Sequence, residues 1–169
     1  MKAGEALEEL RIRKARMEEL SEIEAVYAYA RGFMARNGNA AQWGTANPPR
    51  QTLAADIAKG NLYVICGAEQ ICGVFAFFLG GDPTYGYIDG AWHHAQPYGT
   101  IHRVAGNGTR KGILEKCVAF CESKAGYLRI DTHEDNHIMQ HLLAKLGFSC
   151  CGTIYLENGS PRLAYDRLK

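Results

Sequence analysis

The feature that most constrains the fold is a segment of the second half of the chain that changes its periodicity twice. Residues 98–105 (YGTIHRVA) have the character of a strand, and the glycine-bearing turn 106–112 (GNGTRKG) follows. Residues 113–121 then repeat apolar side chains at helical spacing, and residues 127–131 (YLRID) alternate apolar and polar side chains as a strand does. This order predicts a βαβ unit with two parallel strands and a right-handed crossover.

The rest of the chain predicts a mixed α/β fold. Residues 62–66 and 71–78 are two strand-like runs, and the short turn 67–70 between them predicts an antiparallel hairpin. The length of 169 residues fits one domain, 1–169, and the hairpins favour a mostly antiparallel sheet of about six or seven strands with about four flanking helices. Further elements are expected as strands near 10–13, 153–156 and 163–165 and as helices near 17–34 and 138–146. A short helix is also expected after the irregular segment 37–50, running through Leu53 and Ile57 and ending near Gly60.

Composition excludes several classes of protein. A formal net charge of +1 gives no overall field that would attract nucleic acid or a membrane surface. The longest apolar run, 71–79, is too short to span a membrane, and the amino terminus carries acidic residues where a secretory signal would be apolar. Most of the six cysteines lie in apolar stretches, so we expect reduced thiols in a cytoplasmic protein.

The turn before the predicted helix at 113–121 has the properties of an anion site. Backbone N–H groups at the start of a helix are unpaired and carry partial positive charge, and glycines let a phosphate approach closely. Arg110 and Lys111 add full charges. The spacing of a Walker P-loop and that of a Rossmann motif are both missing. The segment therefore predicts a phosphate-binding turn, although a tight turn without a ligand also explains it.

A second segment, residues 128–148 (LRIDTHEDNHIMQHLLAKLGF), combines a strand, an Asn shortly after it and a helix that closes on LGF. It resembles motif B of the GCN5-related N-acetyltransferases (GNATs), which move an acetyl group from acetyl-CoA to an amine. Upstream, residues 110–113 (RKGI) resemble the core of that family's motif A, usually written Q/R-x-x-G-x-G/A. The order of elements is similar along nearly the whole chain, but the amino half matches in pattern only.

The resemblance implies a GNAT-like fold in which the parallel strands near 100–105 and 127–131 splay apart, with acetyl-CoA lying between them like an added strand. It implies that the pantetheine arm pairs with the backbone of Val104 and Ala105, and that the side chain of Asn136 holds the pantetheine. It also implies that the pyrophosphate lies in a cradle of backbone N–H groups, formed by Arg110, Lys111, Gly112, Ile113 and Leu114.

The chain departs from the family pattern at several positions. Thr109 stands where the motif begins with Gln or Arg, and Leu114 stands where it ends on a small residue. Leu143 stands where the family commonly has a helical Tyr that protonates the leaving thiolate. Tyr155 or Tyr165 are candidates to replace that acid, although tyrosines in late strands usually only pack.

An amine is protonated near neutral pH, so the transfer requires a general base. His102 is one candidate, because it lies on the central strand just before the predicted cofactor segment and histidine changes charge near neutral pH. The alternation of the strand also allows His102 to be a structural histidine of the core. Glu134 and His133, just past the neighbouring strand, are rival candidates that also fit a solvated loop.

The resemblance implies that acceptor specificity lies in the first helices, their connecting loop and the late strands. Trp43 and Tyr87 are the candidate acceptor-binding residues, and Asp82 or Asp89 could attract a cationic amine or serve only in turns. The acceptor is expected to be a small-molecule or peptide amine, with no nucleic-acid or membrane partner. A homodimer is left open.

Two other functions remain open at this point. A catalytically silent acyl-CoA sensor would keep the fold and explain the missing Tyr. A metal-dependent enzyme would use the cluster His133, Glu134, His137 and His141. Residues 133–137 (HEDNH) have the spacing of the zinc motif H-E-x-x-H, but that motif binds zinc from within a helix, whereas His133 and Glu134 are expected in the loop just past a strand. We therefore expect no metal and interpret the cluster as a histidine-rich helix surface.

Overall fold

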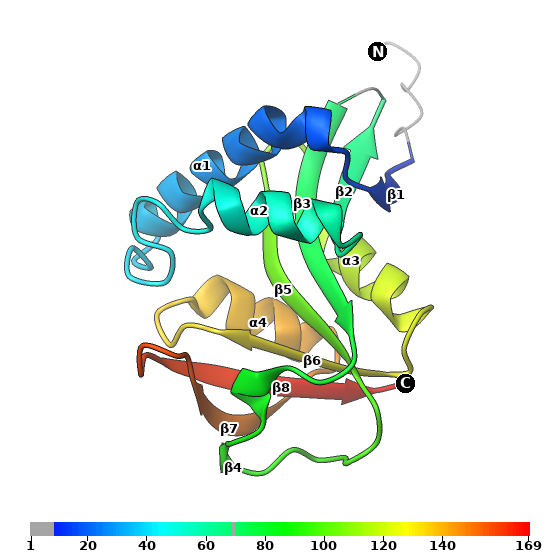
Figure 1. Ribbon diagram of the computed structural model, residues 1–169. Coiled ribbons are helices and arrows are strands. Elements are labelled where there is room, and N and C mark those ends of the chain that lie inside the picture. The colour runs from blue at the N-terminus through cyan, green and yellow to red at the C-terminus, as the bar shows by residue number, and fades with distance from the viewer. Residues whose placement is uncertain (1–8, 69) are drawn as a thin grey trace, which may run out of the picture.

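An eight-stranded sheet forms the centre of the computed structural model, which describes residues 9–68 and 70–169 (Figure 1). The strand order is β1-β2-β3-β5-β6-β8-β7-β4, and every neighbouring pair is antiparallel except β5 with β6. The strands are β1 (Arg11–Lys14), β2 (Leu62–Gly67), β3 (Gln70–Leu79), β4 (Asp89–Gly90), β5 (Gly99–Gly106), β6 (Tyr127–Thr132), β7 (Ser149–Tyr155) and β8 (Pro161–Leu168).

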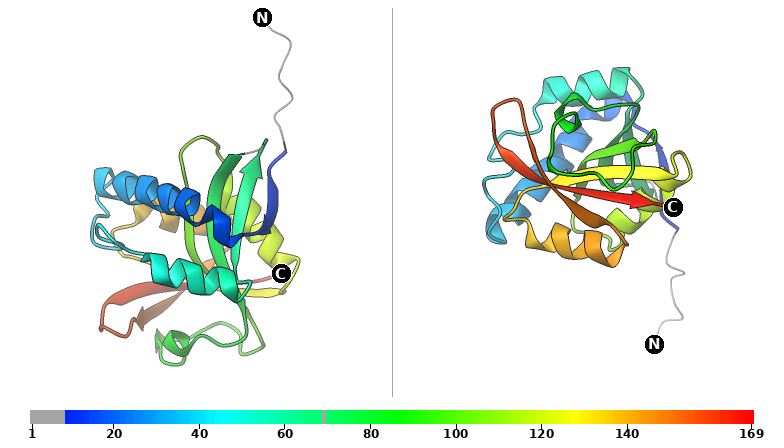
Figure 2. Two further views of the ribbon diagram at one scale, coloured as in Figure 1. Left: turned by 45° about the horizontal axis from the view of Figure 1, so that its top comes forward. Right: turned by 90° about the horizontal axis from the view of Figure 1, so that it is seen from below.

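Helices cover both faces of this sheet. They are α1 (Leu20–Arg36), α2 (Arg50–Ala58), α3 (Ile113–Glu122) and α4 (His137–Lys145), with short 3-10 turns η1 (Met17–Glu19) and η2 (Pro83–Tyr85). α1 and α2 pack on one face through a cluster that includes Ile23, Tyr27 and Leu53, whereas α3 and α4 pack on the other through Cys117 and Leu143. Figure 2 shows the sheet between these layers. Burial on both faces explains why β3 is a nearly continuous apolar run.

The predicted mixed α/β fold with a parallel strand pair is confirmed, and the eighth strand is the two-residue β4 in the loop 80–99. The strand expected near 153–156 begins earlier, at Ser149, because a register shift between Cys150 and Gly152 interrupts the alternation of side chains. Glu69 of the predicted hairpin turn and the acidic amino terminus up to residue 8 lie outside the described residues.

The cysteines are all free thiols, and four of them are buried. Cys66 is half-buried and Cys150 is exposed. In the described part of the chain, no helix has both the length and the apolar character needed to cross a bilayer.

The parallel strands β5 and β6 diverge soon after they meet. They pair only where Gly99–Ile101 lies beside Leu128–Ile130, and beyond Ile101 β5 turns away to follow β3 (Figure 1). A bulge accompanies the divergence, because Val74 pairs with Ala105 whereas Ala76 pairs with His102, which leaves an extra residue on β5. This splayed pair positions the candidate site.

Candidate active site

Two cavities are lined by residues of the splayed strands. The larger has a volume of about 620 Å³ and the smaller about 370 Å³, both within the range of small-molecule sites. Both cavities are lined by Met34 of α1, Val104 of β5, and Asn136 and Met139 at the start of α4. A molecule that extends from one cavity into the other must therefore pass these side chains.

The larger cavity brings together every residue predicted to contact a cofactor. They are Val104, Ala105, Arg110, Lys111, Gly112, Ile113, Leu114 and Asn136. They come from the end of β5, the turn that follows it and the amino termini of α3 and α4, which the topology places beside one another. Apolar side chains of α1 and α4, among them Phe33 and Leu142, form the opposite wall.

The amino terminus of α3 opens into this cavity without a side-chain cap. Its N-cap is Gly112, which has a left-handed conformation (φ 79°) and no side chain to bond the first N–H groups of the helix. Gly108, in the same turn, has φ 81°, and an added Cβ there would lie 2.2 Å from the hydroxyl of Tyr29. A larger residue there would have to displace the Tyr29 side chain and adopt a φ that favours glycine, and the uncapped N–H groups of α3 are suited to an anion.

Asn136 lies at the amino terminus of α4 and lines both cavities. As the N-cap, its Oδ1 accepts a hydrogen bond from the backbone N–H of Met139 at 3.1 Å. Its Nδ2 donates to Oε1 of Gln42 at 3.0 Å, which ties α4 to the loop after α1. This side chain is therefore held in place, and one amide hydrogen remains for another partner.

The smaller cavity contains a histidine between two carboxylates. His102 Nε2 lies 2.6 Å from Oδ2 of Asp82, and His102 Nδ1 lies 3.6 Å from Oδ2 of Asp131. Tyr85 donates its hydroxyl hydrogen to the same Asp131 oxygen at 2.6 Å, and Thr84 donates to Asp82 through both its N–H and its hydroxyl. These contacts fix the imidazole at the cavity surface, where its side chain is 21% exposed.

The pKa values of this cluster follow from burial and hydrogen bonding. Burial disfavours the charged form of Asp82, but hydrogen bonds from His102 and Thr84 outweigh it and lower the pKa of the carboxyl to about 2. Burial and the neighbouring Asp131 raise the pKa of Tyr85 well above its usual value. Asp82 is therefore an anion and Tyr85 a hydroxyl donor throughout the physiological range.

Two arginines lie on the same cavity. Arg103, at the bulge of β5, has a positive φ of 53° and an ion pair with Asp56 of α2, and its carbonyl accepts a hydrogen bond from Tyr27 at 2.7 Å. Arg162 of β8 is 8% exposed and donates to the backbone carbonyls of Pro161 and Gln42. The smaller cavity thus combines acidic and basic side chains.

The comparisons with known proteins agree with this geometry. An acetyltransferase of the GNAT family from Streptococcus agalactiae 2603 is 32% identical, with 95% of each chain covered and a TM-score of 0.83. The chain belongs to the GNAT family of acetyltransferases. No protein-family model and no curated protein matches the sequence.

More distant structures share the GNAT fold. A putative acetyltransferase from Staphylococcus aureus Mu50 is 23% identical, with a TM-score of 0.67 and coverage of 93% of this chain and 97% of that one. A putative acetyltransferase from Salmonella typhimurium, solved with its cofactor acetyl-CoA, is 14% identical, with a TM-score of 0.62 and coverage of 94% and 93%.

Within this GNAT fold, the predicted catalytic and acceptor-binding residues do not all lie together. His102 and Trp43 line the smaller cavity, and Trp43 also packs edge-on against Tyr27, with ring centroids 5.6 Å apart. Glu134 is exposed in the turn after β6, outside both cavities. Tyr155 and Tyr87 are also outside the cavities, with exposed fractions of 41% and 69%, and their rings lie against each other.

The position that usually carries the family's tyrosine is not part of either cavity. Leu143 is fully buried in the core between the sheet and the helices α3 and α4. Tyr165, the other candidate replacement, is also buried in that core. Among the described residues common to both cavities, only Asn136 has a polar side chain.

The histidines of the proposed metal cluster do not converge. His137 and His141 are exposed on α4, whereas His133 Nδ1 accepts a hydrogen bond from the backbone of Asp135 at 3.0 Å. In the described ranges, the one group of His, Cys, Asp or Glu side chains close enough to share an ion consists of His93, Cys151 and Asp166.

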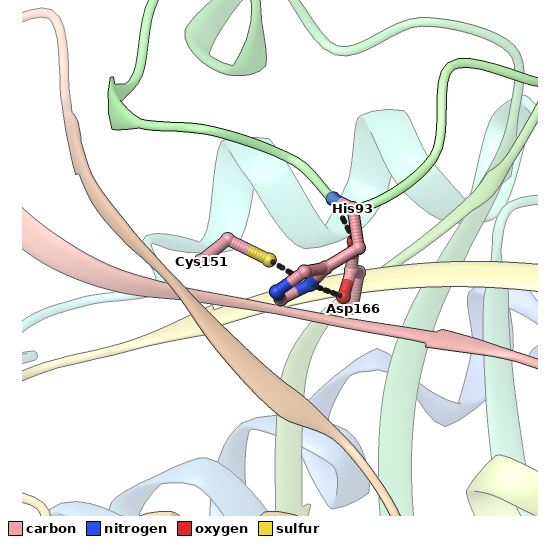
Figure 3. A group of neighbouring side chains, drawn as sticks. All are labelled: His93, Cys151 and Asp166. Carbon is pink, nitrogen blue, oxygen red and sulfur yellow. Dashed lines mark hydrogen bonds and ion pairs between the residues drawn. The ribbon is translucent and has the colours of Figure 1, made fainter.

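That group forms a hydrogen-bonded cluster beneath the loop before β5 (Figure 3). His93 Nδ1 lies 2.6 Å from Oδ1 of Asp166 and 3.2 Å from Sγ of Cys151, and the backbone N–H of His93 donates to Oδ2 of Asp166. Tyr127 also donates to that carboxylate. Burial and Asp166 raise the pKa of the Cys151 thiol to about 12. These contacts anchor the loop before β5 to β7 and β8. The thiol of Cys151 is protonated in this cluster.

Sequence reasoning missed several polar residues of the smaller cavity, above all Asp131 and Arg162. The sequence places Asp131 in an alternating strand with no indication of a site, and Arg162 precedes a strand expected near 163–165. Alternation could have found Asp131, because Ile101 pairs with Ile130 and their successors His102 and Asp131 then share a face.

Proposed function

We propose that this GNAT protein transfers an acetyl group from acetyl-CoA to a primary amine held in the smaller cavity. The observation that carries the proposal is the His102–Asp82 pair on one side of Val104, with the glycine cradle of α3 on the other. The acetyl donor and the amine would thus meet beside Val104, where the two cavities join. Such direct transfer in a ternary complex needs no covalent enzyme intermediate.

The residues of the larger cavity fit acetyl-CoA. The uncapped N–H groups of α3 suit its pyrophosphate, and Lys111 lies exposed beside them to add a positive charge. Beyond Ile101, β5 has no parallel partner in the described residues, so its edge near Val104 and Ala105 offers backbone groups to the pantetheine arm. When bound, acetyl-CoA supplies the acetyl group as a thioester, which an uncharged amine attacks.

His102 is proposed as the general base. Asp82 is ionised and bonded to Nε2, so it favours the tautomer with hydrogen on Nε2 and leaves Nδ1 as the acceptor. Asp131 lies 3.6 Å from Nδ1 and stabilises the positive charge that the ring gains. The arrangement is that of a base oriented by a carboxylate, as in hydrolytic triads.

A primary ammonium ion loses one proton before it attacks and another as the amide forms. His102 takes the first proton at Nδ1. The second proton is on the nitrogen that bonds to the acetyl group. This N–H is the proton source nearest to the departing sulfur. Because this transfer needs no side-chain acid, Leu143 in place of the family's tyrosine is compatible with turnover.

The test is acetyl-CoA binding by calorimetry together with CoA release in the presence of a panel of amines. Binding together with turnover supports the proposal. Binding without turnover for any amine supports the acyl-CoA sensor, and absence of binding rejects both. His102→Gln should retain acetyl-CoA binding and lose turnover, which separates a defect in chemistry from a defect in the donor site.

A further inference from the structure

The smaller cavity contains a buried cation without a carboxylate in contact. Arg162 is 8% exposed, and in the described chain its side chain donates only to backbone carbonyls, at 2.8 Å to Pro161 and 3.2 Å to Gln42. No described Asp or Glu oxygen lies within 4.0 Å of it. A buried charge is unfavourable unless an opposite charge compensates it, and burial accordingly lowers the pKa of this guanidinium.

The other arginines of this region have their charges compensated. Arg103 forms an ion pair with Asp56. Arg129 is as buried as Arg162, but its guanidinium lies over the rings of Trp92 and Tyr98, 4.1 and 4.0 Å from their centroids. Arg103 lines the same cavity but has Asp56 as its counter-ion, and Arg129 does not line it. Arg162 lines the cavity with no carboxylate in contact and retains N–H groups that no described residue accepts.

Asp131 is a candidate counter-ion, but its Oδ2 faces other partners. It is close enough to favour the charged form of Arg162, yet its Oδ2 accepts the hydroxyl of Tyr85 at 2.6 Å and lies 3.6 Å from His102. Asp131 therefore belongs to the acidic side of the cavity, with Asp82 and His102. The cavity has an acidic side beside the proposed base and a separate guanidinium.

A ligand that matches both sides carries an ammonium group and a carboxylate. We propose that the acceptor is an amino acid, whose amine lies beside His102 and Asp131 and whose carboxylate pairs with Arg162. A guanidinium binds a carboxylate through parallel hydrogen bonds, which orients the ligand as well as holding it. The cavity volume of about 370 Å³ suits a single amino acid. The inference rests on the proposed function, because it names the acceptor of that same site.

The experiment compares each amino acid with the amine that lacks its carboxylate: leucine with isopentylamine, phenylalanine with phenethylamine, and lysine with cadaverine. CoA release is measured for each. For at least one pair, kcat/KM for the amino acid should exceed that for its amine by roughly 30-fold or more, as expected for a buried charge pair. A dipeptide amide tests a peptide amine, which has no carboxylate to place on Arg162.

Arg162→Gln should remove this preference by raising KM for the amino acid, while the affinity for acetyl-CoA and the rates with the plain amines stay within about twofold of wild type. Arg162→Lys should retain part of the preference. Arg36→Gln, at the exposed end of α1 and outside both cavities, is the matched control and should change nothing.

The inference is overturned if plain amines or the dipeptide amide are acetylated as well as the amino acids, or if no amino acid is a substrate. The proposed function survives the first result, because turnover is then present. The proposed function fails instead when no amine is acetylated, whether or not acetyl-CoA binds. If Arg162→Gln does not fold, the wild-type comparison alone decides between these outcomes.

Discussion

His102 and Asp82 form a hydrogen-bonded pair, with Nε2 of the imidazole 2.6 Å from Oδ2 of the carboxylate. The two residues come from different parts of the sheet region, β5 and the start of η2, and the pair lies on the wall of the smaller cavity. Thr84 holds the other carboxylate oxygen through two hydrogen bonds. The imidazole is therefore oriented before any acceptor binds.

His102→Gln is expected to lower kcat/KM by roughly 10²- to 10⁴-fold, because it removes the proposed base but keeps a polar side chain. Acetyl-CoA affinity should stay unchanged. The measurement is steady-state CoA release with the best amine at saturating acetyl-CoA. His141→Gln, on the exposed surface of α4, is the control and should behave as wild type. Equal loss in both variants would exclude a specific role for His102.

Asp82 should make the free energy of unfolding depend on pH in the acidic range. Its pKa is about 2, below the ordinary value of 3.8, so its stabilising effect is complete above the ordinary value and is lost as the pH falls through 2. The side chain is 16% exposed, and the effect amounts to roughly 2 kcal/mol at most.

The unfolding free energies of wild type and Asp82→Asn, measured with urea between pH 6 and pH 3, test this. The difference between the two proteins should be largest near pH 6 and fall by roughly half near pH 3. Asp89→Asn, on the exposed β4, serves as the control and should show no such trend. A difference that stays constant over this range would contradict the assignment.

The larger cavity, proposed as the donor side, could be predicted from the sequence because its information is local. The glycines and charges of 106–112 lie in one turn, and a strand before and a helix after that turn fix where its N–H groups point. All the residues predicted there line one cavity. Backbone geometry determines this half of the site, and backbone geometry is what periodicity predicts best.

The smaller cavity, proposed as the acceptor side, could not be predicted in the same way, because it is assembled from segments far apart in the chain. Asp82, His102, Asp131 and Arg162 come from a loop and three strands. Their meeting depends on sheet order, which places β8 beside β6 although a helix and a strand separate them in sequence. The order of strands in a sheet is not a periodic property of a single segment.

Tyr155→Phe tests whether the sequence-based candidate for the missing acid takes part in catalysis. Its ring lies against Tyr87 outside both cavities and is 41% exposed, so we expect kcat and KM for the best amine to stay within about twofold of wild type. Steady-state kinetics at saturating acetyl-CoA is the measurement. A fall in kcat of roughly 100-fold or more, with normal acetyl-CoA affinity, would return Tyr155 to the mechanism.

Gly112→Glu tests the cradle at the amino terminus of α3. The added carboxylate would stand beside the uncapped N–H groups, where it repels a pyrophosphate and competes for the same hydrogen bonds. The dissociation constant for acetyl-CoA, measured by calorimetry, should rise by roughly tenfold or more. KM for the amine should change little, because Gly112 lines only the larger cavity.

Backbone strain must be separated from charge, since Gly112 has a φ of 79° that most residues avoid. Gly112→Asn is the matched control, because Asn tolerates this conformation and carries no charge. If both variants bind acetyl-CoA equally weakly, the turn is needed for its backbone shape rather than for the positive charge of its N–H groups. If Gly112→Glu binds as tightly as wild type while remaining folded, the pyrophosphate does not lie at this helix, and the donor must enter elsewhere.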